Sequence, residues 1–303
     1  VREGENFIPA SKTPFAKDST FGYSSSDLKH YIQEKHKGSV KLDKIASIDI
    51  DLLRSPSRNK ITKIIDSKNY EYLVVNATSH ADLEAFAVAA LGSNEDLIYR
   101  TAASFINAII GLRPATCLLK RDIIKIPSKN GALVIIGSYV PKTTAQLKYL
   151  REHYNAQYIE LDVEELLSDT DLKNTLTNFA GVVDSYLKKG QNIVVYTSRK
   201  VKTGKSKEES LQIVNLVSKS LTNLVGLLRT RPRFILAKGG ITSSDIVVKS
   251  LQTKRALVLG QIIKGVPVWS TDDNSKFKNL PYIVFPGNVG STADLFNVLK
   301  KLE

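Results

Sequence analysis

The chain has 303 residues, which favours two domains, and its 42% hydrophobic and 24% charged residues are typical of a globular protein. No apolar run approaches the length of a membrane span, the polar first residues show no signal-peptide pattern, and the single Cys117 cannot form an internal disulfide, so we expect a cytoplasmic protein without a membrane partner. The formal net charge of +13 indicates an anionic partner, either nucleic acid or a small phosphate- or carboxylate-bearing substrate.

The first part of the chain predicts a short α/β alternation. Residues 1–23 have an irregular pattern, and Ser25 or Ser26 is suited to cap a helix that runs to about His36. Two strands then alternate with two helices, at Tyr72–Val75, Ala81–Leu91, Leu97–Arg100 and Ala102–Ile110. A break around 112–131, with two prolines and a Ser-Lys-Asn-Gly cluster, indicates a linker. We therefore expect one domain at residues 1–125 and a second at 126–303.

The second part of the chain alternates strands and helices more regularly. Strands are expected at Ala132–Ile136, Tyr158–Leu161, Asn192–Tyr196, Phe234–Ala237, Leu257–Ile263 and Tyr282–Phe285. Helices are expected from Pro141 to about Tyr154, at Leu172–Lys188, at Glu209–Leu228, behind Thr242, and at Ala293–Leu302. The pattern predicts the α/β class: two α/β domains with largely parallel sheets, helices on both faces, and a ligand crevice at the carboxyl ends of the strands.

Three strand ends carry glycine turns, in the runs IIGSYVP (135–141), LAKGGITSSD (236–245) and VFPGNVGSTAD (284–294). Glycine leaves room for a ligand to approach the backbone, and Ser138 can offer a hydroxyl. Thr242 with Asp245, and Ser291 with Asp294, resemble capping boxes at helix N-termini, where the helix dipole favours an anion. One such turn is equally an ordinary strand–helix connection, but three at one sheet edge predict a nucleotide-sized anionic ligand.

Two common nucleotide-binding motifs are excluded. The run 204-GKS-206 resembles the end of a P-loop, but Arg199 stands where that loop requires a glycine. No G-x-G-x-x-G occurs, which disfavours a dinucleotide site of the Rossmann type. The basic cluster 199–207 lacks the aromatic residues of an RNA-binding surface, so we interpret it as a solvated loop.

Several longer runs resemble the four-carbon acid sugar kinase family. Its C-terminal nucleotide-binding domain is similar to GSYVPKTTAQL (137–147), AKGGITSSD (237–245), VLGQIIKGVPVW (258–269) and PYIVFPGNVG (281–290). The later part of its N-terminal acid-sugar-binding domain is similar to TPFAKDSTFGYSSSDL (13–28) and YRTAASFINA (99–108). The resemblance covers essentially the whole chain.

The resemblance implies a carbohydrate kinase, which transfers the γ-phosphate of ATP to the terminal hydroxyl of a four-carbon sugar acid such as threonate, erythronate or 3-oxo-tetronate. The implied ATP-binding residues are Ser138, Gly239, Gly240, Ile241, Thr242, Gly287, Asn288 and Gly290. Mg²⁺ is expected because phosphoryl transfer requires neutralisation of the β- and γ-phosphate charge. Asp245 is a candidate ligand for it, and a capping role explains that residue equally well.

The first residues depart from the family pattern. Family members begin with a strand and an Asp-Asp turn that holds the sugar acid, and nothing in Val1–Tyr23 matches it. We therefore expect a fragment whose own catalytic residues are unknown and whose turnover is poor. Candidate contacts to the sugar acid are Arg100, Thr101 and Ser104, and more weakly Lys17 and Asp18. Arg100 equally suits a residue that caps the edge of a sheet, although its guanidinium can bind a carboxylate through two hydrogen bonds.

Two other functions compete with a kinase. A non-catalytic module that binds a nucleotide or a sugar acid is favoured by the unmatched front end, and a nucleic-acid-binding protein is suggested only by the charge. We expect small anions rather than nucleic acid to be the partners. A homodimer is an open alternative to a monomer.

Overall fold

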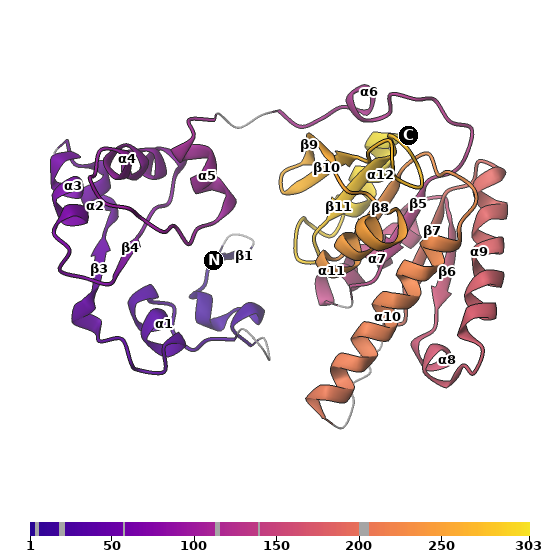
Figure 1. The fold of residues 1–303 in the computed structure, drawn as a ribbon, viewed down its shortest axis with the longest axis horizontal. Coiled ribbons are helices and arrows are strands. Elements are labelled where there is room, and N and C mark those ends of the chain that lie inside the picture. Colours follow the sequence, from indigo (N-terminus) through magenta and orange to yellow (C-terminus); the bar gives the residue numbers. More distant parts are fainter. Residues whose placement is uncertain (4–5, 18–21, 57, 113–115, 139, 200–205) are drawn as a thin grey trace. The chain divides into compact units, whose positions relative to one another are not determined.

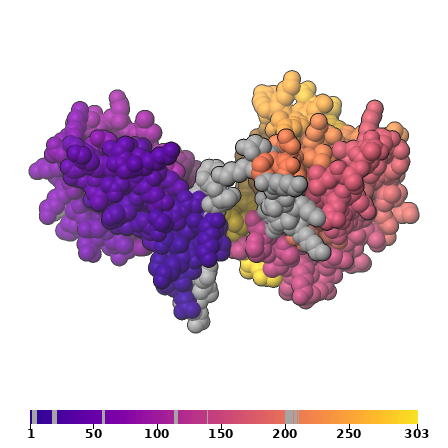
Figure 2. Space-filling model, turned by 90° about the horizontal axis from the view of Figure 1, so that it is seen from below, coloured from indigo at the N-terminus to yellow at the C-terminus, as the bar shows by residue number. Residues whose placement is uncertain are grey.

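The computed structural model describes all residues of the chain except 4–5, 18–21, 57, 113–115, 139 and 200–205. Contacts divide the chain into unit 1, Val1–Pro114, and unit 2, Ala115–Glu303 (Figure 1). Each unit has its own hydrophobic core, and Figure 2 shows the surface of unit 1 in indigo to purple and that of unit 2 in magenta to yellow. The boundary expected between residues 125 and 126 stays a prediction of where the functional domains divide. Among the helices formed by the described residues, none combines the length and the apolar character needed to cross a bilayer.

Unit 1 is built around a short parallel pair of strands, β3 (Ile45–Ile48) and β4 (Tyr72–Val75). Its helices are α1 (Leu28–Lys35), α2 (Ile50–Arg54), α3 (Arg58–Asp66), α4 (His80–Leu91) and α5 (Ala103–Ile109). Its first residues form the two-residue strands β1 (Arg2–Glu3) and β2 (Asn6–Phe7), and three 3-10 turns follow, η1 (Ala10–Lys12), η2 (Pro14–Lys17) and η3 (Leu42–Lys44). Apolar side chains of α2, α3, α4 and α5 pack with Ile48 into the main core of the unit.

Two expectations for unit 1 are wrong. Helix α1 is capped by Asp27, whose carboxylate accepts the N–H groups of Lys29 and His30 at 2.8 and 3.1 Å, rather than by Ser25 or Ser26. The segment Leu97–Arg100 is not a strand. Its Ile98 is fully exposed, and Leu97 and Tyr99 pack against the core of the unit from an irregular segment.

The described part of unit 2 contains a seven-stranded sheet in the order β6-β7-β5-β8-β11-β10-β9 (Figure 1). The strands are β5 (Leu133–Ile136), β6 (Gln157–Leu161), β7 (Ile193–Thr197), β8 (Ile235–Lys238), β9 (Leu257–Ile263), β10 (Val266–Ser270) and β11 (Pro281–Phe285). The pairs from β6 to β11 are parallel, and β10 is antiparallel to both of its neighbours. The predicted α/β class with a largely parallel sheet is confirmed.

Helices cover both faces of this sheet. They are α6 (Lys120–Ile123), α7 (Pro141–His153), α8 (Val163–Ser168), α9 (Leu172–Lys188), α10 (Lys207–Leu227), α11 (Gly240–Asp245) and α12 (Asp294–Leu302), and a π-helical turn, η4 (Ile246–Ser250), continues α11. Strand residues alternate between two cores, because successive side chains of a strand point to opposite faces. One core packs under α8, α9, α10 and η4, and the other packs under α7 and α12.

Strand β10 is absent from the sequence-based expectation. Its Pro267 cannot donate a hydrogen bond to a sheet, which argues against an internal strand. The pairing of β10 with β9 shifts register between Val266 and Pro267, so an irregularity accommodates the proline.

Candidate functional site

Three neighbouring parallel strands of unit 2 end level with one another. Lys238 at the end of β8 pairs with Ile136 of β5 on one side and with Phe285 of β11 on the other. The turns that follow these residues therefore begin at one edge of the sheet. The chain leaves β5 toward β6 and leaves β8 toward the opposite side, so the boundary between β5 and β8 is a topological switch point. Open α/β sheets bind ligands at such points, and the three predicted turns meet there.

Packing between the turns leaves no room for side chains at three of the glycines. A Cβ atom on Gly137 would lie 2.3 Å from Oγ1 of Thr242, and one on Gly287 would lie 2.9 Å from Oγ of Ser138. A Cβ atom on Gly239 would lie 3.2 Å from Cβ of Ser138, and its φ of +122° is one that other residues rarely adopt. Because these glycines have no side chains, the three turns can pack closely against one another, with Ser138 between them.

Gly240 differs from these three glycines because it borders open space. A Cβ atom there would meet no heavy atom within 4 Å. Ile241 is 64% exposed, and Asn288 is also exposed. The open side of the site therefore carries the first turn of α11, whose N–H groups lack partners within the helix.

The predicted capping box of α11 is wrong. The helix begins at Gly240, with Gly239 as its N-cap, so Thr242 lies inside the first turn and is buried. Ser243 ties this turn to the sheet instead, because its hydroxyl lies 2.8 Å from the carbonyl oxygen of Ala237 and 2.6 Å from that of Gly239. Because the helix begins at Gly240, which has no side chain, the backbone of the turn is accessible.

The third turn keeps only part of its predicted cap. The carboxylate of Asp294 accepts the N–H of Ser291 at 2.6 Å, as a capping box requires, and an amide N–H of Asn297 at 3.1 Å. Helix α12 begins at Asp294 itself and has Ala293 as its N-cap. Gly290 lies against Asp294 with a φ of +85°, which glycine adopts without strain.

Two buried polar residues of α7, both absent from the predicted site, hold the turns. The hydroxyl of Thr143 lies 3.2 Å from Oγ of Ser138 and donates to the carbonyl oxygen of Gly287 at 3.0 Å. The amide of Gln146 donates to the carbonyl oxygens of Val289 and Ser291 at 3.1 and 2.8 Å. The signal in the sequence is two polar residues, three apart, on the helix face that also carries Leu147 and Leu150.

Lys238, the last residue of β8, is fully buried among the turns. Its Nζ donates to the carbonyl oxygens of Pro286 and Gly287 at 2.7 and 3.2 Å and lies 4.1 Å from the centre of the Phe285 ring. Burial, and secondarily the charge of Lys142, lower the pKa of Lys238 to about 7. Within the described part of the chain no carboxylate forms an ion pair with it.

A second cation, Arg199, follows β7 beside the same edge. Its guanidinium donates to the carbonyl oxygens of Ser138 and Thr197 at 2.7 and 2.9 Å and to the hydroxyl of Thr197 at 2.8 Å. Burial lowers its pKa. Of the rejected P-loop run, Gly204 and Lys205 lie outside the described residues, whereas the hydroxyl of Ser206 accepts the N–H of Glu209 and caps α10.

The candidate magnesium ligand is already engaged. Asp245 accepts a hydrogen bond from Ser218 at 2.8 Å and forms an ion pair with Lys249 at 2.8 Å, and the Lys249 ammonium is the main cause of its lowered pKa. The Asp245 side chain makes no capping hydrogen bond to the N-terminus of α11 or η4. Among the described residues, no three His, Cys, Asp or Glu side chains gather as a metal site would require.

The residues predicted to contact a sugar acid lie on the surface of unit 1. Arg100 and Thr101 belong to the irregular segment before α5, and Ser104 lies in the first turn of that helix. All three are exposed. Arg100 does not cap a sheet edge, because no strand ends there. Lys17 is exposed at the end of η2, and Asp18 lies outside the described residues.

An ion pair of unit 1 that the sequence did not predict joins a buried carboxylate to an exposed arginine. Asp82 of α4 is 3% exposed and accepts hydrogen bonds from Arg54 at 2.9 and 3.1 Å. It also accepts the backbone N–H groups of Thr78 and Ser79 after β4. Arg54, and then the N–H of Thr78, hold its pKa far below the ordinary value. These bonds complete the capping box of α4, so the cluster is structural.

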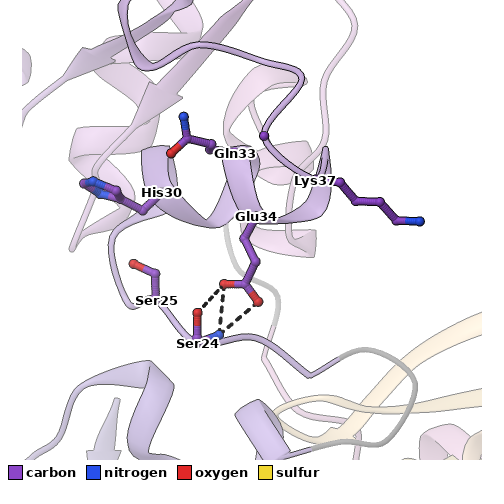
Figure 3. A pocket seen from close by; sticks show the side chains of 7 residues that line it. Ser24, Ser25, His30, Gln33, Glu34 and Lys37 are labelled. Carbon is purple, nitrogen blue, oxygen red and sulfur yellow. Dashed lines mark hydrogen bonds between the residues drawn. The ribbon is translucent and has the colours of Figure 1, made fainter.

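An open pocket of unit 1 lies beside α1 and includes Ser24, His30, Glu34 and Lys37 in its lining (Figure 3). The carboxylate of Glu34 accepts hydrogen bonds from the N–H and the hydroxyl of Ser24. In Figure 3 His30 and Lys37 extend in different directions rather than toward one point. The pocket therefore lacks converging groups.

Comparisons with known proteins agree with this division of the chain. Residues 133–295 match a family model described as a nucleotide-binding C-terminal domain, and residues 3–109 match one described as a sugar-binding N-terminal domain. No curated protein matches the chain.

Two solved structures share the fold. One is a Haemophilus influenzae protein of the DUF1537 family, with 17% identity and a TM-score of 0.60 over 97% of this chain and 68% of its own. The other is a Salmonella typhimurium LT2 protein provisionally described as a tRNA synthase, with 16% identity and a TM-score of 0.64 over 97% of this chain and 67% of its own. With a sugar-binding and a nucleotide-binding domain in this order, the chain belongs to the four-carbon acid sugar kinase family.

Proposed function

We propose that the protein binds ATP at the three turns of unit 2 and transfers its γ-phosphoryl group to the terminal, 4-hydroxyl group of a four-carbon sugar acid. Threonate, erythronate and 3-oxo-tetronate are the candidate acids. The observation that carries the proposal is the meeting of three glycine turns at the switch point, next to a buried cation that pairs with no carboxylate of the described residues.

The residues of unit 2 suit the phosphates of a nucleotide. Peptide N–H groups from Gly240 to Thr242 open the first turn of α11, and Gly240 leaves space in front of them, whereas the N–H of Gly239 donates to the carbonyl oxygen of Phe285. Ser138 stands between the turns with a hydroxyl that can donate to an anion. Phosphoryl transfer depends mainly on positioning and on electrostatic stabilisation, so a rigid set of backbone donors is an appropriate device for it.

Mg²⁺ fits the proposal as an ion that accompanies the nucleotide. Magnesium commonly keeps several waters and is held by substrate phosphates with few protein ligands, and the described residues offer no cage of carboxylates. When bound, it would neutralise charge on the β- and γ-phosphates. Asp245 is a poor ligand for it, because its carboxylate is engaged by Ser218 and Lys249.

The sugar acid is proposed to contact unit 1 through Arg100, Thr101 and Ser104. A guanidinium can hold a carboxylate through two parallel hydrogen bonds, and hydroxyl groups suit a sugar. The family match of residues 3–109 supports a sugar ligand for this unit. No catalytic base is assigned.

A non-catalytic nucleotide-binding module is the second candidate. It is favoured by the contrast between the buried, interlocked turns of unit 2 and the exposed positions of Arg100, Thr101 and Ser104.

The two candidates are separated by one set of assays on the full chain. Calorimetry with ATP is expected to give saturable binding to unit 2. Coupled ADP release is then measured with ATP, Mg²⁺ and a panel of threonates, erythronates and 3-oxo-tetronates. Turnover of one acid supports the kinase, and ATP binding without turnover of any acid supports the module. Absence of ATP binding contradicts both.

A further inference from the structure

No carboxylate among the described residues balances the charge of Lys238. Transfer of an ammonium group from water into a protein interior is costly unless an opposite charge or several hydrogen bonds compensate it. Lys238 is fully buried, and its compensation in the described structure is two carbonyl oxygens and the face of Phe285. A neutral side chain of the same length would fill this position at less cost. An ionisable amine at this buried position therefore indicates a function that uses its charge.

The two carbonyl contacts also fix the direction of the third turn. In a trans peptide the N–H points opposite to the C=O of the same unit. Because the carbonyls of Pro286 and Gly287 point toward Lys238, the N–H groups of Gly287 and Asn288 point away from it. Thr143 also helps to fix the turn, because its hydroxyl donates a hydrogen bond to the Gly287 carbonyl. Two successive peptide donors are thus held on the side of the turn opposite the ammonium.

We propose that Lys238 is an electrostatic positioning residue for the phosphates of the nucleotide: its buried ammonium orients the N–H groups of Gly287 and Asn288 and supplies the positive charge that a polyphosphate at the three turns requires. The inference rests on the proposed nucleotide site. The chemical class of its ligand is a polyphosphate ester, because a nucleoside without phosphates would gain nothing from the charge.

The charged groups of the turns and of the helices beside them are consistent with this role. Lys142 of α7 is a further cation and lowers its pKa, whereas a structural partner would be an anion. Arg199, after β7, donates to Ser138 and Thr197. Asp294, at the start of α12, accepts from Ser291 and Asn297. The anion that balances Lys238 is therefore best supplied by a ligand.

Two neutral variants separate charge from shape. Lys238→Met keeps the length of the side chain without a donor, and Lys238→Gln keeps an N–H donor without a charge. Both are compared with the unaltered chain by calorimetry with ATP and with adenosine. We expect both to lose about tenfold or more in affinity for ATP and to bind adenosine within about twofold of the unaltered chain. Lys148→Met, on an exposed position of α7, is the matched control and should change neither affinity.

The outcomes distinguish failure of the role proposed for Lys238 from failure of the nucleotide site on which that role depends. If the unaltered chain binds neither ATP nor adenosine, the proposed nucleotide site is wrong and the inference fails with it. If the unaltered chain binds both, and the Lys238 variants weaken both equally or neither, the nucleotide site stands and the electrostatic role is wrong. Equal weakening would mean that Lys238 only maintains the shape of the turn.

A measurement on the unaltered chain covers the case in which the variants do not fold. Calorimetry of ATP binding at pH 8 in two buffers of different ionisation enthalpy counts the protons exchanged. At this pH ATP is fully ionised, and a lysine with a pKa of about 7 is mostly neutral before the ligand arrives. Uptake of about one proton per ATP is expected, because the phosphates favour the ammonium form. Uptake of no proton overturns the proposal.

Discussion

The two units of the chain hold their predicted site residues in contrasting ways. In unit 2 the residues come from three segments far apart in the sequence, yet Ser138 lies against both Gly239 and Gly287. In unit 1 Arg100, Thr101 and Ser104 are neighbours in the sequence, yet all three are exposed. Parallel strands that end in register bring distant turns to one place, whereas a surface segment positions its side chains only through local structure.

This contrast predicts different responses to substitution. Groups that interlock in a packed site cannot be changed without affecting their neighbours, so substitutions in unit 2 should reduce either stability or nucleotide binding sharply. Substitutions of exposed residues in unit 1 should leave stability unchanged and affect only the ligand they contact.

The largest effect is expected for Gly239→Ala. A φ of +122° is strained for alanine, and the new Cβ would lie 3.2 Å from that of Ser138. We expect unit 2 to lose about 2 kcal/mol or more of unfolding free energy, measured by urea titration. Gly181→Ala, in α9 where a Cβ meets nothing within 4 Å, is the control and should leave stability equal or slightly higher. Equal stability of the two variants would contradict the geometry of the turn.

Gly240→Val should block the nucleotide without disturbing the fold. Its side chain enters open space at the first turn of α11, in front of the proposed phosphate donors. We expect affinity for ATP to fall by more than about tenfold in calorimetry, with the cooperative unfolding transition retained. Gly181→Val provides the matched control on α9. Unchanged ATP affinity in a folded Gly240→Val protein would remove this turn from the site.

The sequence predicts much of unit 2 because its elements follow strong local patterns. Strand β9 has its expected bounds of Leu257–Ile263, and helix α9 those of Leu172–Lys188, because each is a clear apolar or amphipathic run. Strand β10 could not be predicted, since Pro267 argues against an internal strand and only its pairing with two neighbours overrides that preference. In unit 1 the run Leu97–Arg100 has strand-like residues but pairs with none of the strands that the described residues form.

The same distinction holds for the site. Glycine turns are visible in the sequence, and so is their place at strand ends. The hydrogen-bond partners of Thr143, Gln146 and Lys238 are not visible in the sequence. Thr143 and Gln146 donate to carbonyl groups well over a hundred residues away, and Lys238 donates to a carbonyl group that follows a neighbouring strand. The cap of α11 was misplaced because Thr242 has the right residue type, but the helix already begins at Gly240.

Arg100→Ala tests the proposed role of unit 1. Loss of the guanidinium should weaken binding of the sugar acid about tenfold in calorimetry with threonates and erythronates, because a two-bond contact to the carboxylate is removed. Affinity for ATP and the stability of the protein should not change, since Arg100 is exposed. Arg121→Ala, at an exposed position of α6, is the control. If both variants bind the acid alike, Arg100 does not contact the substrate.

The smallest effect is expected from pH. The pKa of Lys238 is lowered to about 7, so the ammonium form becomes scarce as the pH rises above that value. ATP affinity should therefore be greatest at or below pH 7 and fall roughly fivefold from pH 7 to pH 8, because binding must then recover the proton. Lys238→Gln has no such group and should lack this decrease, which separates it from the titration of ATP itself. A decrease of the same size in both proteins would contradict the assignment.

The same lowered pKa has a consequence for stability. In the unfolded chain this lysine keeps a pKa near 10.4, so between about pH 7 and that value the unfolded state binds the proton that the folded state has released. The contribution of Lys238 to stability therefore becomes more favourable as the pH rises through this window.

Hydrogen–deuterium exchange with and without ATP tests the central claim most directly, namely that the three turns of unit 2 together form one nucleotide site. ATP should slow the exchange of backbone amides in the segments 137–138, 239–242 and 287–290 at the same time, because they meet at one edge of the sheet. Exchange in α9 should not change. Protection of only one of the three segments, or protection confined to another part of unit 2, would contradict the account.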